Sequence, residues 1–123
     1  MIKLSFSVRR LDSVPEDEFH RYWRDEHGPL VRSVKDDIGV VRYVQSHTIN
    51  TPINEVIRQS RGALEPFDGV AELWWDSLES FIGGSSSEAG RRAAALLLED
   101  EKRFIDLERS SLFVTEESVI IGD

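Results

Sequence analysis

His27 is the residue best placed for proton transfer, because it precedes a Gly28–Pro29 step at the end of an amphipathic segment. A histidine titrates near neutral pH, as general acid and base catalysis requires, and this position would hold it at the rim of a cavity. The alternative is structural: the imidazole would cap a helix C-terminus, where positive charge is favourable. Position alone leaves both interpretations open.

A segment rich in β-branched and aromatic residues carries polar side chains at every second position, namely Tyr43, Gln45 and His47. Alternate residues of a strand project to one face, so these three side chains either line a polar cavity or face solvent. Asp68 lies at the start of a similar segment. It would either orient a histidine, as a carboxylate does in hydrolase triads, or form a turn or bulge with Gly69.

The composition excludes several classes of function. The chain has 123 residues, 15 Lys and Arg against 23 Asp and Glu, a net charge of -8 and no cysteine. This balance argues against nucleic-acid binding and against anionic membrane surfaces, both of which need clustered positive charge. Without cysteine there are no disulfides, thiolate nucleophiles or Cys-ligated metals. No apolar run approaches a membrane span, and the alternating N-terminus is unlike a signal peptide, so we expect a cytoplasmic protein.

Metal and cofactor motifs are also missing from the sequence. No H-E-x-x-H occurs, and His20, His27 and His47 lack a recognised ligand spacing. A metal site built by the fold from His27, His47 and Asp68 stays open as an alternative. No Gly-rich phosphate loop or dinucleotide fingerprint is present. We therefore expect neither a metal nor a cofactor. His20 and the acidic run at Glu99 to Glu101 are interpreted as solvated helix positions.

Hydrophobic periodicity predicts the elements that carry these residues. Period-two alternation indicates strands, and apolar residues three and four apart indicate amphipathic helices. Ser13 and Glu16 have capping-box spacing at the start of the first helix, and Asp76 and Glu79 have it at the start of a later one. The Gly28–Pro29 step should break or kink the first helix just after His27. The predicted strands are 2–8, 40–49, 67–75 and 112–121, and the predicted helices are 15–27, 52–61, 77–82 and 88–107.

The order β-α-β-β-α-β, with an extra short helix between the second and third strands, is the ferredoxin-like plan. We predict one α+β domain over residues 1–123, with an antiparallel sheet covered by helices on one face. The other face carries apolar residues as well, since Leu73 and Trp74 would point to opposite sides. We therefore predict a homodimer that buries the open sheet face and closes a barrel between two subunits. Trp23 and Trp74 are expected as pocket wall or core.

Five segments along the chain carry distinctive residue patterns. They are F-x-x-Y-W-x-x-x-H-G-P-L at 19–30, R-Y-V-Q-S-H at 42–47, S-R-G at 60–62, D-G-V-A-E-L-W at 68–74, and D-E with F-I-D at 100–106. Together they resemble the EthD family, which usually has Asn in place of Ser46. The resemblance covers nearly the whole chain and implies a subunit of the dimeric α+β barrel superfamily. In related lactone isomerases, a His near the end of the first helix and a Tyr on the second strand line the pocket, and His27 and Tyr43 match these positions.

These observations lead to one principal hypothesis: a cofactor-free lyase or isomerase, similar to a dehydratase, acting on a hydrophobic oxygenated carbonyl compound such as a polyketide or aromatic breakdown product. His27 would be the general acid or base, and His47 a second proton carrier or carbonyl-polarising group. Tyr43 would bind the enolate, and Asp68 would orient one histidine. Substrate contacts are expected from Trp23, Gln45 and Trp74. The alternatives are a carrier protein for a hydrophobic metabolite and a cofactor-free monooxygenase.

Overall fold

A four-stranded antiparallel sheet forms one layer of the molecule. The computed structural model describes residues 1–123, and the sheet order is β2-β3-β1-β4. Each neighbouring pair is antiparallel, which confirms the predicted ferredoxin-like plan. The observed strands are β1 (Ile2–Val8), β2 (Arg42–His47), β3 (Gly69–Trp75) and β4 (Ser111–Thr115).

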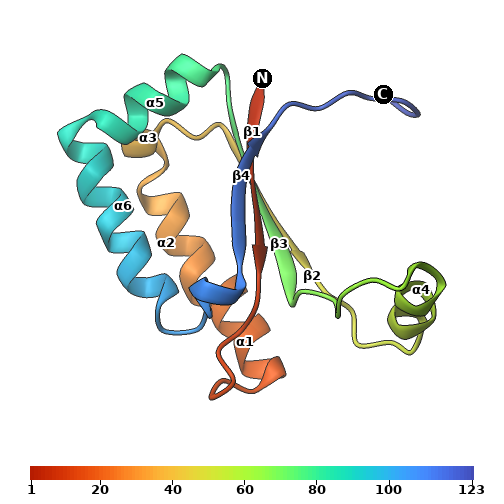
Figure 1. Ribbon diagram of the computed structural model, residues 1–123. Coiled ribbons are helices and arrows are strands. Elements are labelled where there is room, and N and C mark those ends of the chain that lie inside the picture. Colours follow the sequence, from red (N-terminus) through yellow and green to blue (C-terminus); the bar gives the residue numbers. More distant parts are fainter.

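Helices cover one face of this sheet and leave the other open (Figure 1). One short helix, α4, projects away from the helical layer beyond the ends of β2 and β3 (Figure 1). No helix of the chain has the length and apolar character needed to cross a membrane. The helices are α1 (Glu16–Tyr22), a π-helical turn (Trp23–His27), α2 (Gly28–Ser33), α3 (Lys35–Ile38), α4 (Ile53–Arg61), α5 (Leu78–Ser86), α6 (Glu88–Glu101) and a 3-10 turn (Leu107–Arg109).

The first helical run does not break at Gly28–Pro29, and the irregularity predicted there is a π-helical turn. The backbone widens into the π-helical turn just before this step, and the N–H of Gly28 donates to the carbonyl of Trp23. Pro29 then lies in the first turn of α2, where its missing N–H costs no intrahelical hydrogen bond. The predicted Ser13 cap is also wrong, because Pro15 occupies the N-cap position.

Several other element ends differ from the expectation. The strands β2 and β4 are shorter than predicted, and α6 ends at Glu101 rather than near 107. The cap of α5 is Ser77, whose hydroxyl accepts from the N–H of Ser80 at 3.1 Å, so the predicted Asp76 cap is wrong. The helix then continues through the two glycines, and the break comes at Ser87, which caps α6.

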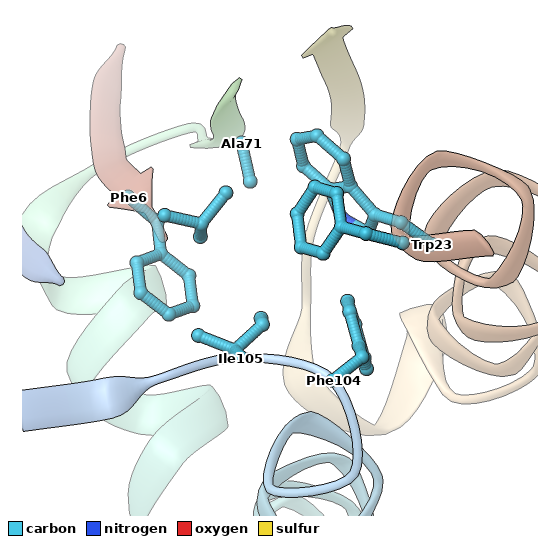
Figure 2. Close-up of a cluster of buried hydrophobic side chains, with 7 residues drawn as sticks. Phe6, Trp23, Ala71, Phe104 and Ile105 are labelled. Atoms are coloured by element: carbon cyan, nitrogen blue, oxygen red, sulfur yellow. The ribbon is translucent and has the colours of Figure 1, made fainter. Parts of the chain in front are cut away.

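Strand register decides which polar residues face the helices. Tyr43 pairs with Leu73, and His47 pairs with Gly69, on the face that also carries Ala71. This inner face packs on the first helical run and on the turn that follows α6. Figure 2 shows the resulting cluster, in which aromatic rings from the first helical run and from this turn meet β1 and β3. Its buried members are Phe6, Val8, Phe19, Trp23, Ala71, Phe104 and Ile105.

Gly69 is required by the position of Trp23. A Cβ at this position would lie 2.5 Å from the indole ring and 2.6 Å from the carbonyl oxygen of Ser46. Real Cβ atoms do not approach other atoms so closely, so any larger residue would displace the ring or the strand. The close contact allows Trp23, which is 1% exposed, to lie against the sheet beside the polar residues of β2.

Candidate active site

A partly open cavity of about 190 Å³, called the enclosed cavity below because its walls are the sheet and the helices, lies between the inner face of the sheet and the helices. Of its 19 lining residues, 15 are hydrophobic, so the few polar groups in it stand out. His27, Tyr43 and Glu101 are three of them, and they come from the π-helical turn, β2 and the end of α6. An apolar cavity with a few convergent polar groups is the usual form of a small-molecule site.

His27 is buried, with 5% of its surface exposed, and its Nδ1 lies 2.7 Å from Oδ2 of Asp100. A carboxylate only accepts hydrogen bonds, so Nδ1 carries the hydrogen and Nε2 of the neutral ring holds a lone pair. Burial lowers the pKa of His27, and the hydrogen bond and charge of Asp100 partly offset that effect. The imidazole is therefore a neutral base at physiological pH.

Asp100 is held in place from a second direction, because the hydroxyl of Tyr22 donates to its Oδ1 at 2.5 Å. This carboxylate was assigned to a solvated helix face, and that assignment was wrong. Its side chain is only 13% exposed. The missed signal is helical periodicity: Leu97, Asp100, Glu101 and Phe104 recur at the spacing of one helix face.

Glu101 was assigned to the same solvated face, and it instead lines the cavity. Burial is the main cause that raises its pKa to about 7, and the neighbouring charge of Asp100 adds to the effect. At neutral pH a large fraction of this carboxyl group is protonated, so it can donate a proton or a hydrogen bond. The cavity thus contains a base and an acid on different elements.

Tyr43 is oriented by a chain of hydrogen bonds along β2. Nε2 of Gln45 donates to the carbonyl of Trp23 and to the hydroxyl oxygen of Tyr43, both at 2.8 Å. Oε1 of Gln45 accepts from Nε2 of His47 at 2.8 Å, so Nδ1 of that ring accepts from His20 at 2.7 Å. Because its oxygen already accepts, the Tyr43 hydroxyl keeps its own hydrogen for a ligand. Burial raises the pKa of Tyr43 and keeps this hydrogen in place.

His47 supports this network from outside the enclosed cavity, which it does not line. Both of its ring nitrogens are engaged, by Gln45 and His20. Burial, followed by the charges of His20 and Arg24, lowers the pKa of His47. His20 was expected to be solvated, and this was wrong, because it is half-buried against His47.

Asp68 does not orient a histidine. Its carboxylate accepts from the backbone N–H of Arg10 at 2.8 Å and lies 3.7 Å from Nε of the same residue. The reason is strand parity: His47 pairs with Gly69, so the adjacent Asp68 belongs to the opposite face. Asp100 occupies the role that the sequence interpretation gave to Asp68.

Trp74 is on that opposite face too, and it does not line this cavity. Its indole N–H donates to Glu117 at 2.8 Å. The Nζ of Lys3 lies 5.4 Å from the ring centroid, and the guanidinium of Arg42 lies 4.9 Å from it. Trp74 therefore lies away from the cavity, whereas Trp23 lines it.

The family model of the EthD domain matches residues 11–108, which include His27, Tyr43, Asp100 and Glu101. The chain belongs to the EthD family. It is similar to an EthD family protein from Bacillus halodurans, with 19% identity, a TM-score of 0.64, and coverage of 96% of this chain and 99% of that one. An EthD-like protein from Ralstonia eutropha gives 20% identity and a TM-score of 0.63, with 98% and 94% of the two chains covered.

A third similar structure is described as a dimeric ferredoxin-like protein of unknown function from Thermobifida fusca. It shares 12% identity with this EthD-family chain and a TM-score of 0.57, over 93% of this chain and 88% of that one. These likenesses confirm the α+β fold. No curated protein matches the chain at a significant level.

Replacing Glu101 by Gln tests the burial of this carboxyl group. Its folded pKa of about 7 exceeds the ordinary value of 4.5, so the folded state binds the proton more tightly than the unfolded chain. The stability that this tighter proton binding gives the folded state is fully present below pH 4.5 and is lost as the pH rises through 7. Relative to Glu101→Gln, the wild-type protein should lose about 1–3 kcal/mol of unfolding free energy between pH 4.5 and 8.

Urea unfolding at several pH values measures this difference. The matched control is Glu99→Gln on the same helix, whose side chain is 70% exposed and should leave the pH dependence unchanged. If the wild-type and Glu101→Gln curves run parallel with pH, Glu101 is solvated and is not part of the site.

Proposed function

We propose that this EthD-family protein is a cofactor-free lyase or isomerase that moves protons on a hydrophobic carbonyl compound. The observation that carries the proposal is the His27–Asp100 pair, with Nδ1 fixed by the carboxylate and the ring lining an apolar cavity. A buried neutral imidazole held in this way is suited to remove a proton from a carbon atom.

The other polar groups supply the remaining parts of such a reaction. Nε2 of His27 would take the proton from the carbon α to the carbonyl, and Asp100 would stabilise the imidazolium that forms. The Tyr43 hydroxyl would donate to the developing enolate oxygen. Protonated Glu101 would deliver a proton to a second carbon in an isomerisation, or to a departing hydroxyl group in a dehydration.

A carrier protein for a hydrophobic metabolite is the second candidate. The observation that favours it is the lining itself, since hydrophobic residues make up most of the cavity wall. A carrier needs affinity but no accessible base. The two candidates therefore differ in whether a bound ketone loses its α-protons.

The experiment is hydrogen–deuterium exchange at the α-carbons of 2-tetralone, an apolar ketone, followed by proton NMR in D₂O. We expect the protein to accelerate exchange and His27→Ala to remove about 10²–10⁴-fold of that acceleration. The rate should fall as the pH drops below 6.5, because the lowered pKa of His27 places its protonation there. The control is Glu99→Gln, a 70% exposed position that lines neither pocket.

Binding of 2-tetralone without accelerated exchange would favour the carrier. Equal exchange rates for the wild-type protein and a folded His27→Ala variant would contradict the assignment of the base.

We also propose a homodimer formed through the open sheet face. That face carries the outward residues of all four strands, including Val44, Val70 and the 52% exposed Phe113. The similar protein from Thermobifida fusca is described as dimeric. Light scattering should give twice the chain mass of 14.0 kDa, and Phe113→Asp should lower it toward one chain. A mass of one chain for the wild-type protein at about 100 μM would exclude the dimer.

A further inference from the structure

A second, more open pocket of about 550 Å³ adjoins the enclosed cavity. Val31 and Tyr43 line both, so these two side chains stand between the two spaces. The outer pocket lies between the start of α2 and β2, which is an edge strand of the sheet. A molecule that reaches from the cavity into the outer pocket would have to pass the Tyr43 side chain.

The outer pocket is lined by positively charged residues, whereas the protein as a whole is negatively charged. Four of the 15 Lys and Arg residues line it, and no Asp or Glu does, although the chain has a net charge of -8. Only one of the four forms an ion pair, between Arg24 and Asp25 at 3.1 Å. Arg32 and Lys35 have no carboxylate within ion-pair distance. The guanidinium of Arg42 lies over the Trp74 ring on the other face of the sheet, so Arg32 and Lys35 are the free cations of the pocket.

Unpaired cations around a concavity concentrate positive potential there and attract anions. Arginine in particular binds carboxylate and phosphate groups through its planar fork of N–H donors. Arg32 and Lys35 lie together at this pocket without carboxylate partners and next to an apolar cavity. This arrangement fits a ligand with a charged end and a hydrophobic body.

We propose that the outer pocket binds the anionic group, a carboxylate or a phosphate ester, of the same molecule whose hydrophobic body occupies the enclosed cavity. The claim that this molecule is also the substrate rests on the proposed function. The binding claim does not, because it requires neither His27 nor turnover. The site would thus select acidic aromatic or polyketide-like compounds over neutral ones of the same shape.

The test compares ligands of one shape and different charge by isothermal titration calorimetry. The probes are 2-naphthoate, 2-naphthyl phosphate and the neutral 2-acetylnaphthalene. We expect at least one anion to bind about tenfold more tightly than the neutral ketone, and its affinity to fall with added salt. Tighter binding of 2-naphthoate would identify the carboxylate as the preferred group, and tighter binding of 2-naphthyl phosphate would identify the phosphate ester.

The variants are Arg32→Gln and Lys35→Gln, whose exposed side chains form no ion pair and should not affect folding. Each should weaken binding of the preferred anion by about three- to tenfold and leave 2-acetylnaphthalene unchanged. The matched control is Arg92→Gln, an exposed position on α6 paired with Glu88, which should change neither affinity.

Equal affinities for all three probes would overturn the proposal. An equal loss of affinity for the anion in Arg92→Gln and Arg32→Gln would also overturn it. His27→Ala should retain the preference for the anion. If the protein prefers the anion but does not accelerate exchange in the ketone, the binding proposal is supported and the proposed reaction is contradicted.

Discussion

The hydrogen bond between Nδ1 of His27 and the carboxylate of Asp100 is the interaction on which the site depends. It joins the first helical run to the end of α6, two segments 73 residues apart in sequence, beside the apolar cavity. Burying a carboxylate is costly unless its oxygens are satisfied, and the second oxygen of Asp100 is satisfied by Tyr22. This hydrogen bond therefore fixes the tautomer of His27 and holds the first helical run against α6. The charge of Asp100 also adds to the effect of burial, which raises the pKa of the adjacent Glu101.

The second constraint is the register of β2 against β3. It places Tyr43 opposite Leu73 and directs three polar side chains toward the helices instead of toward solvent. Inside the fold they satisfy one another and the Trp23 carbonyl, which the π-helical turn brings to Gln45. The closeness of Trp23 to Gly69 makes this arrangement possible, because no side chain intervenes there.

The fold and the position of His27 were predictable from the sequence because local periodicity and the EthD pattern agree. Strand parity correctly placed Tyr43, Gln45 and His47 on one face. The partner of His27 was not predictable in the same way, since two carboxylates were available and only the pairing of strands excludes Asp68. Asp100 was overlooked because charged residues near a helix end usually face solvent. The continuation of the helix through Pro29 depends on the widened turn, which has no clear sequence signal.

The most direct test of the central claim is the pH titration of His27 by ¹⁵N NMR, in the wild-type protein and in Asp100→Asn. The account predicts a neutral ring protonated on Nδ1, with a pKa below 6.5 that falls further in the variant, because Asp100 favours the charged form. A ring protonated on Nε2, or a pKa at or above 6.5 that Asp100→Asn does not change, would contradict it.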